Sequence, residues 1–201
     1  MKNIPRIVPM IAGLGSLAGL LATGCGTARG GYESAPYRVV RASGKFELRD
    51  YPALTVVETP MDRGGSGSDG SFNRLFRFIT GGNEAKQKIA MTTPVFMSGD
   101  DTNATMAFVM PAEMKAGTVP KPTDSSVTVC ELAAGRFAVL RYSGARNAKN
   151  EAESLERLRA WMKQEGLKEL SPPAYGYFDP PWTPAFLRRN EVMLRIETVR
   201  P

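Results

Sequence analysis

The chain has no histidine among its 201 residues. This absence excludes Ser-His-Asp and Cys-His catalytic centres, and it excludes every metal site that depends on imidazole ligands. Cysteine is also scarce, since Cys25 and Cys130 are the two thiols. Cys130 lies in the apolar run 127–132, which favours a buried, inert thiol over a nucleophile. No carboxylate pair stands at a spacing typical of a general acid and base, so the sequence predicts a protein that is not an enzyme.

Charge and hydropathy are both moderate. Hydrophobic residues make up 42% of the chain and charged residues 23%, which is typical of a globular domain. The formal net charge is +6, but lysine and arginine alternate with acidic residues and form no basic tract. No nucleic-acid-binding motif accompanies them, so we expect no nucleic-acid partner. The length fits a single domain with its own core.

The first 24 residues differ in composition from the rest. They carry Lys2 and Arg6 and no acidic residue, followed by an apolar run, 7–22, rich in glycine, leucine and alanine. This order of a charged and an apolar segment is typical of a secretory signal. The segment ends in Leu21-Ala22-Thr23-Gly24-Cys25, which resembles a bacterial lipobox.

The lipobox resemblance implies a lipoprotein signal peptide over 1–24 and lipidation of Cys25. Residues 25–36 are then expected to be a lipidated flexible tether, with the folded domain over 37–201. The residue after the cysteine is Gly26 and not aspartate, which favours the outer membrane, with the domain facing the periplasm. Ordinary secretion with cleavage nearby and an uncleaved anchor are the alternatives.

Residue patterns predict an α+β domain. Helices are expected over 72–80 and 151–164 because apolar residues recur at helical spacing and each segment ends in glycine. The strand, helix, strand, strand order occurs twice, which suggests an internal duplication. Strands are expected over 37–40, 45–50, 53–59, 89–97, 105–110, 127–132, 137–142, 175–178 and 191–198.

The helix over 72–80 shows an apolar stripe together with a separate polar and aromatic side. Phe78 falls off the stripe, and Arg74 and Arg77 lie three residues apart near it. An exposed ring beside two guanidinium groups would suit a flat anionic ligand, because arginine stacks on π systems and pairs with carboxylates. The stripe itself is expected to pack into the core and consists of Phe72, Leu75, Phe76 and Ile79.

Three ordered motifs resemble the SOUL/heme-binding protein family. The run 72–97 reads FNRLFRFITGGNEAKQKIAMTTPVFM, and the run 175–194 reads YGYFDPPWTPAFLRRNEVML. Between them, 120–124 reads PKPTD. The resemblance spans roughly 37–197 and implies a distorted antiparallel β-barrel or curved sheet, built from the two repeats and flanked by two helices.

The resemblance also implies a function, which is reversible binding of heme or a related tetrapyrrole by an exported, membrane-anchored, monomeric carrier or buffer. In that family the ligand lies between the first helix and the C-terminal hairpin, so we expect Arg74 and Arg77 at the propionates. Phe78 and Trp182 are expected to cover the ring. A binding module for another flat hydrophobic molecule is the alternative, and an enzyme acting on such a ligand is the third reading.

Axial ligation of the iron has few candidates in this chain. Because imidazole is absent, ligation would fall to methionine, tyrosine or thiolate. Met91 and Met97 lie on one face of the predicted strand 89–97 and are the candidates, although a methionine in a strand is more often part of the core. The expected mode is a groove that holds the porphyrin faces and propionates without a strong bond from protein to iron.

The lipobox generates the first prediction. Two acyl chains anchor a protein stably, whereas one chain gives marginal binding, so wild-type protein should fractionate with membranes. Cys25→Ser should move the protein into the soluble fraction, measured by immunoblotting of separated membrane and soluble fractions. Identical partitioning of the two proteins would show that Cys25 is not the anchor.

Overall fold

The computed structural model of the chain describes residues 31–61, 69–99 and 103–197. The predicted signal peptide 1–24, Cys25 and the predicted tether as far as residue 30 lie outside these ranges. The end of the predicted tether is part of the fold, because β1 (Glu33–Ser34) pairs in parallel with β5 (Thr92–Thr93). Ala35, which follows β1, is buried in the core. Residues 33–35, which fall within the predicted tether 25–36, are therefore part of the folded domain.

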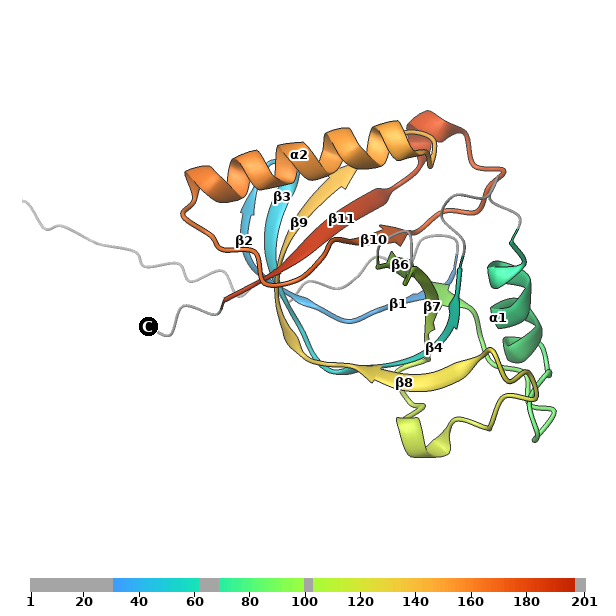
Figure 1. Cartoon of the computed structure of the whole chain (residues 1–201). Coiled ribbons are helices and arrows are strands. Elements are labelled where there is room, and N and C mark those ends of the chain that lie inside the picture. The colour runs from blue at the N-terminus through green and yellow to red at the C-terminus, as the bar shows by residue number, and fades with distance from the viewer. Residues whose placement is uncertain (1–30, 62–68, 100–102, 198–201) are drawn as a thin grey trace, which may run out of the picture.

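One curled sheet of nine strands forms the body of the domain (Figure 1). Its pairings are all antiparallel, in the order β2-β3-β9-β11-β10-β6-β7-β4-β8. The strands are β2 (Arg38–Ser43), β3 (Phe46–Tyr51), β4 (Leu54–Pro60), β6 (Val95–Ser98), β7 (Thr105–Val109), β8 (Thr128–Leu132), β9 (Gly135–Tyr142), β10 (Ala174–Tyr177) and β11 (Asn190–Ile196).

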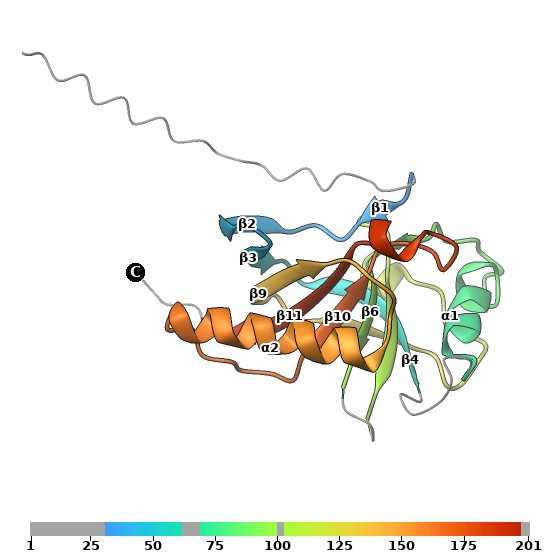
Figure 2. The same ribbon diagram turned by 90° about the horizontal axis from the view of Figure 1, so that it is seen from above.

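Two helices lie on the outer face of this sheet (Figures 1 and 2). α1 (Ser71–Ile79) packs on β4 and β7, and α2 (Ala148–Gln164) packs on β9 and β11. Single-turn helices at Ala116–Thr118 and Ala185–Leu187 lie in connections. The predicted α+β fold, with a curved antiparallel sheet and two flanking helices, is confirmed. Among the described residues, neither helix has the length and hydropathy of a membrane-spanning segment.

The two predicted strand-helix-strand-strand repeats are present, and each pairs with a strand from the other half of the chain. The first repeat runs β4-α1-β6-β7 and the second runs β9-α2-β10-β11, with β6 paired to β10 at the join. The strand that precedes each repeat pairs across the join: β3 pairs with β9 of the second repeat, and β8 pairs with β4 of the first. These cross-pairings join the two halves of the chain into one sheet.

Two element boundaries differ from prediction for local reasons. α2 begins one turn before the predicted 151, because the Asn147 side chain caps it by accepting a 2.9 Å hydrogen bond from the Asn150 backbone N–H. The predicted strand 89–97 is split into β5 and β6 by Pro94, which has no N–H to donate to a ladder.

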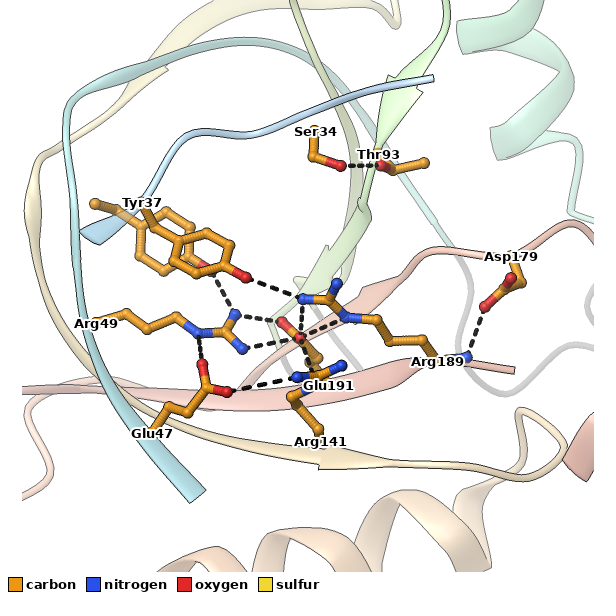
Figure 3. A network of polar contacts seen from close by, with 10 residues as sticks. Ser34, Tyr37, Glu47, Arg49, Thr93, Arg141, Asp179, Arg189 and Glu191 are labelled. Atoms are coloured by element: carbon orange, nitrogen blue, oxygen red, sulfur yellow. Dashed lines mark hydrogen bonds and ion pairs between the residues drawn. The ribbon is translucent and has the colours of Figure 1, made fainter. Parts of the chain in front are cut away.

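A buried ion network connects β3 with β11, the two strands on either side of β9 (Figure 3). Arg49 on β3 is fully buried and donates to both carboxylate oxygens of Glu191 on β11, at 2.7 and 3.0 Å. Arg49 Nε also donates to Glu47 at 2.7 Å, and Arg189 donates to Glu191 at 2.6 Å. The Tyr37 ring lies over the Arg49 guanidinium, 4.1 Å from its centroid.

The charges of this network depend on one another. Burial alone would raise the pKa of Glu191, but the charges and hydrogen bonds of Arg49 and Arg189 lower it below its ordinary value. A carboxyl whose pKa is lowered by folding stabilises the fold above its unfolded pKa, about 4.3. That contribution is lost as the pH falls through the folded pKa.

The network generates the second prediction. Glu191→Gln should lower the free energy of unfolding by about 3–5 kcal/mol, because it removes the fully buried carboxylate that Arg49 and Arg189 share and leaves Arg49 with the Glu47 carboxylate. Urea unfolding at pH 7 measures the change. Lys149→Ala is the control, since its exposed contact with Glu153 at 3.9 Å contributes less than about 0.5 kcal/mol.

The difference between wild type and Glu191→Gln should shrink as the pH falls below about 4.3, where the unfolded chain takes up a proton at Glu191, and vanish once the folded protein is protonated there as well. A variant as stable as wild type at pH 7, or a difference independent of pH, would contradict the role assigned to this carboxylate.

Candidate functional site

The first helix, α1, is fixed at both ends by short polar contacts. Asp69 accepts hydrogen bonds from the backbone N–H and the hydroxyl of Ser71, at 3.1 and 2.7 Å. At the other end, Gly81 adopts φ 114°, a left-handed conformation that glycine tolerates, and the chain leaves the helix. The Asn83 amide then donates to the Phe78 carbonyl at 3.0 Å. These contacts hold the helix in one orientation over β4 and β7.

The outward face of α1 carries two exposed aromatic rings. Phe72 and Phe76 are 44% and 46% exposed, one helical turn apart. Their rings are stacked, with centroids 5.9 Å apart and planes inclined by 14°. Phe72 also contacts Phe108 of β7 edge to face at 5.2 Å, which fixes its position. The pair therefore forms a preorganised apolar surface that a flat molecule can cover.

Phe78 does not lie on that surface. It is 2% exposed and packs in the core with Leu75 and Ile79, so the prediction that Phe78 is an exposed ring is wrong. Phe78 follows Leu75 by three residues and precedes Ile79, so these positions also form a helical stripe. The sheet buries this stripe and leaves Phe72 and Phe76 outside, and the helical period alone does not distinguish the two arrangements.

The two arginines of α1 have different surroundings. Arg74 is used structurally: it donates to Thr59 Oγ1 at 3.0 Å, to the Asp69 carbonyl at 3.1 Å and to the Pro60 carbonyl at 2.6 Å. The Arg77 side chain is exposed and makes no hydrogen bond or ion pair within residues 31–61, 69–99 and 103–197. Arg77 follows Phe76 directly and is the cation of α1 that remains available to a ligand.

The two candidate methionines lie beneath α1 and not on its outer face. Met97 is 5% exposed and belongs to the core cluster that contains Leu75 and Phe78. Met91 is half-buried against the same cluster. Met97 could bind iron only if this core opened, whereas Met91 keeps part of its surface exposed.

A second aromatic surface lies in the connection between β10 and β11. Trp182 is 80% exposed, and its neighbours Phe186 and Leu187 are 75% and 53% exposed. The loop is held by Arg188, which donates to the Thr183 carbonyl at 2.7 Å and to the Pro181 carbonyl. In both overall views this connection extends toward the end of the molecule that carries α1 (Figures 1 and 2).

Phe186 and Leu187 were missed at the level of sequence. The sequence could have indicated their exposure. Proline residues on both sides of Trp182 predict a loop, and apolar side chains in a surface loop are seldom buried in the core. Within the described ranges there is no cluster of three or more acidic, cysteine or histidine side chains able to hold a metal ion.

A curled antiparallel sheet that presents aromatic surfaces on one helix and one loop defines a ligand-binding α+β domain. The chain belongs to the SOUL heme-binding protein family, whose model matches residues 32–195. The family inferred from the three motifs is thus confirmed, and membership supports binding of heme or a tetrapyrrole as the general function.

Known proteins resemble this chain in sequence or in fold. Heme-binding protein 2 from Homo sapiens is 28% identical over 163 residues, which cover 75% of this chain and 78% of the human protein. Among solved structures, a hydrolase from Listeria innocua aligns with a TM-score of 0.57 at 11% identity, over 79% of this chain and 94% of its own. The C-terminal domain of EcmrR aligns with a TM-score of 0.56 at 13% identity, over 77% and 98%. At these identities the two structures support the fold alone.

The contrast between the two arginines generates the third prediction. Arg74→Ala should lower the free energy of unfolding by about 1–3 kcal/mol, because the side chain loses two hydrogen bonds to the end of β4, at Thr59 and Pro60, and one to the Asp69 carbonyl. Arg77→Ala should change it by less than about 0.5 kcal/mol, as expected for an exposed side chain. Urea unfolding of both variants measures this, and equal effects would refute the division of roles.

Proposed function

We propose that the exposed face of α1 binds heme or a related tetrapyrrole reversibly. The observation that carries the proposal is the stacked pair of Phe72 and Phe76, held in place by the Phe72–Phe108 contact. Arg77, the next residue on the helix, is an exposed cation whose long side chain could reach a ligand lying on these rings. A porphyrin face can cover the two rings, and a guanidinium is well suited to a propionate because it forms two parallel hydrogen bonds. Family membership supports the ligand class.

The site proposed here revises the roles expected from sequence. Phe72 and Phe76 replace Phe78 as the rings on α1, and Arg77 alone holds a propionate, since the donors of Arg74 are engaged elsewhere. Trp182 remains the proposed cover for the far side of the ring. Its 80% exposure leaves it a large apolar surface to bury on binding.

The proposed binding mode has no strong axial bond. The chain contains no imidazole, and the sulfurs of Met91 and Met97 belong to the core beneath α1. Weak ligation fits a carrier or buffer, because release then requires no iron–protein bond to break. The carrier would be a monomer, exported and anchored in the cell envelope through Cys25, on the outer membrane facing the periplasm.

Two other functions are the alternatives to tetrapyrrole binding. A different flat hydrophobic molecule would use the same aromatic surface and would differ by making no use of Arg77. An enzyme acting on such a ligand would alter it chemically over time, which repeated spectra of the bound ligand detect.

Hemin binding is the fourth prediction. Titration of the full chain should shift the Soret band without the spectrum of bis-His or His-Met coordination. Arg77→Ala should weaken binding about tenfold, since a partly desolvated charge-assisted hydrogen bond is worth about 1.5–3 kcal/mol. High salt should reduce that effect. Phe76→Ala should also weaken binding, whereas Asn73→Ala, an exposed neighbour on α1, should not.

Hemin dimethyl ester provides the matched ligand control. It lacks propionate charges, so it should bind wild type and Arg77→Ala equally. If Arg77→Ala and Phe76→Ala both bind hemin as wild type does, the ligand does not lie on α1. A low-spin spectrum that disappears in Met91→Leu or Met97→Leu would overturn the proposed weak ligation.

A further inference from the structure

The inner face of the curled sheet contains a cavity that is separate from α1. Its volume is about 360 Å³, at the lower end of the range typical of small-molecule sites. Side chains alternate along each strand, so on β4 Val57 points to the α1 side, while Leu54 and Glu58 point inward. Figure 1 looks along this curl, with β4 and β8 on one side of it and β9 and β11 on the other. Neither helix covers this face.

The cavity wall is predominantly apolar and well ordered. Tyr51 and Phe137 meet edge to face with centroids 5.6 Å apart, and both line the cavity. Phe96 and Met193 contribute from β6 and β11, and both are buried. Aromatic rings, a thioether and a strand methyl at Ala107 together make a surface complementary to a compact apolar body.

One carboxylate, that of Glu58, lies in this apolar wall. Its cross-strand neighbours are Ala107 on β7 and Thr128 on β8, neither of which carries charge. Cys130, also on β8, forms a hydrogen bond with Glu58, and burial together with the Glu58 charge raises the pKa of that thiol to about 11. Among the residues that the structure describes, no lysine or arginine forms an ion pair with Glu58.

The positively charged side chain among the cavity-lining residues, Arg195, makes its hydrogen bonds away from Glu58. Arg195 donates to the carbonyls of Ala133 and Ala134 and lies over the Phe137 ring, 4.9 Å from its centroid. Those carbonyls follow β8, whose last residue pairs with Leu54. Glu58 is four residues farther along β4, about 13 Å away at strand spacing. The cavity therefore has a negative end at Glu58 and an apolar middle.

We propose that this inner cavity binds a small organic amine, with the ammonium group at Glu58 and an apolar body between Phe137, Phe96 and Met193. The half-buried carboxylate of Glu58 has no cationic partner among the described residues, and a ligand ammonium would form a charge-assisted hydrogen bond with it. An anionic ligand would meet repulsion at the same place. The site is independent of the tetrapyrrole surface, because the two lie on opposite faces of the sheet.

Three related indole compounds test the proposal on the full chain: tryptamine as the cation, 3-propylindole as the neutral isostere and indole-3-propionate as the anion. Isothermal titration should give the strongest binding for tryptamine and the weakest for indole-3-propionate. Glu58→Gln should weaken binding of tryptamine at least about tenfold and leave binding of 3-propylindole unchanged. Glu131→Gln is the matched control, because Glu131 lies beside Cys130 on β8 and is exposed.

Location is tested by NMR of protein labelled at the methionine methyl groups. Tryptamine should shift the signal of Met193, which lines the cavity, and leave that of Met97, which lies beneath α1. Absence of tryptamine binding overturns the proposal. So does equal affinity for the cation and the anion, unchanged tryptamine affinity in Glu58→Gln, or a shift confined to Met97.

Discussion

The contact between Arg49 and Glu191 joins residues 142 positions apart in a part of the domain that water does not reach. Two charges in such a place are stable only together, because each one alone would bear a desolvation cost of several kcal/mol. Their geometry therefore constrains the strands that carry them. β3 and β11 must hold fixed positions on either side of β9, and the curvature of the sheet follows from that arrangement together with the strand exchange between the halves.

The curl gives one sheet two different environments for chemistry. Its outer face is covered by two helices, and what remains available there is the solvent side of α1, with the rings of Phe72 and Phe76. Its inner face is narrow, so side chains from strands distant in sequence surround the enclosed volume and include Glu58. The exposed side of α1 suits a wide, flat ligand, and the inner cavity suits a compact one. The curvature of the sheet determines both, because it leaves the outer side open and narrows the inner side.

Sequence patterns predicted those features that depend on near neighbours. Helices, most strands and the repeat order follow from apolar periodicity and from glycine and proline positions, and the motifs identified the family. The side of α1 that faces the sheet could not be predicted, because the stripes through Phe72 and through Phe78 have equivalent helical spacing. The role of Arg74 depends on the backbone of Pro60, and the partner of Arg49 lies across the sheet. These contacts are properties of the assembled fold, and nothing in the local sequence encodes them.

The exchange of strands between the repeats has a consequence for how the chain is made. β3 is synthesised early, yet its neighbour β9 belongs to the second repeat and leaves the ribosome much later. Until then β3 is paired on one side only, with β2, and the Arg49 site is half-formed. Pairings of such long range also slow folding, since the loop between them must close before the contact forms. The core beneath α1, whose buried residues all lie within 57–127, can form early, whereas the open edge of β3 and the Arg49 site are completed only when β9 and β11 have emerged.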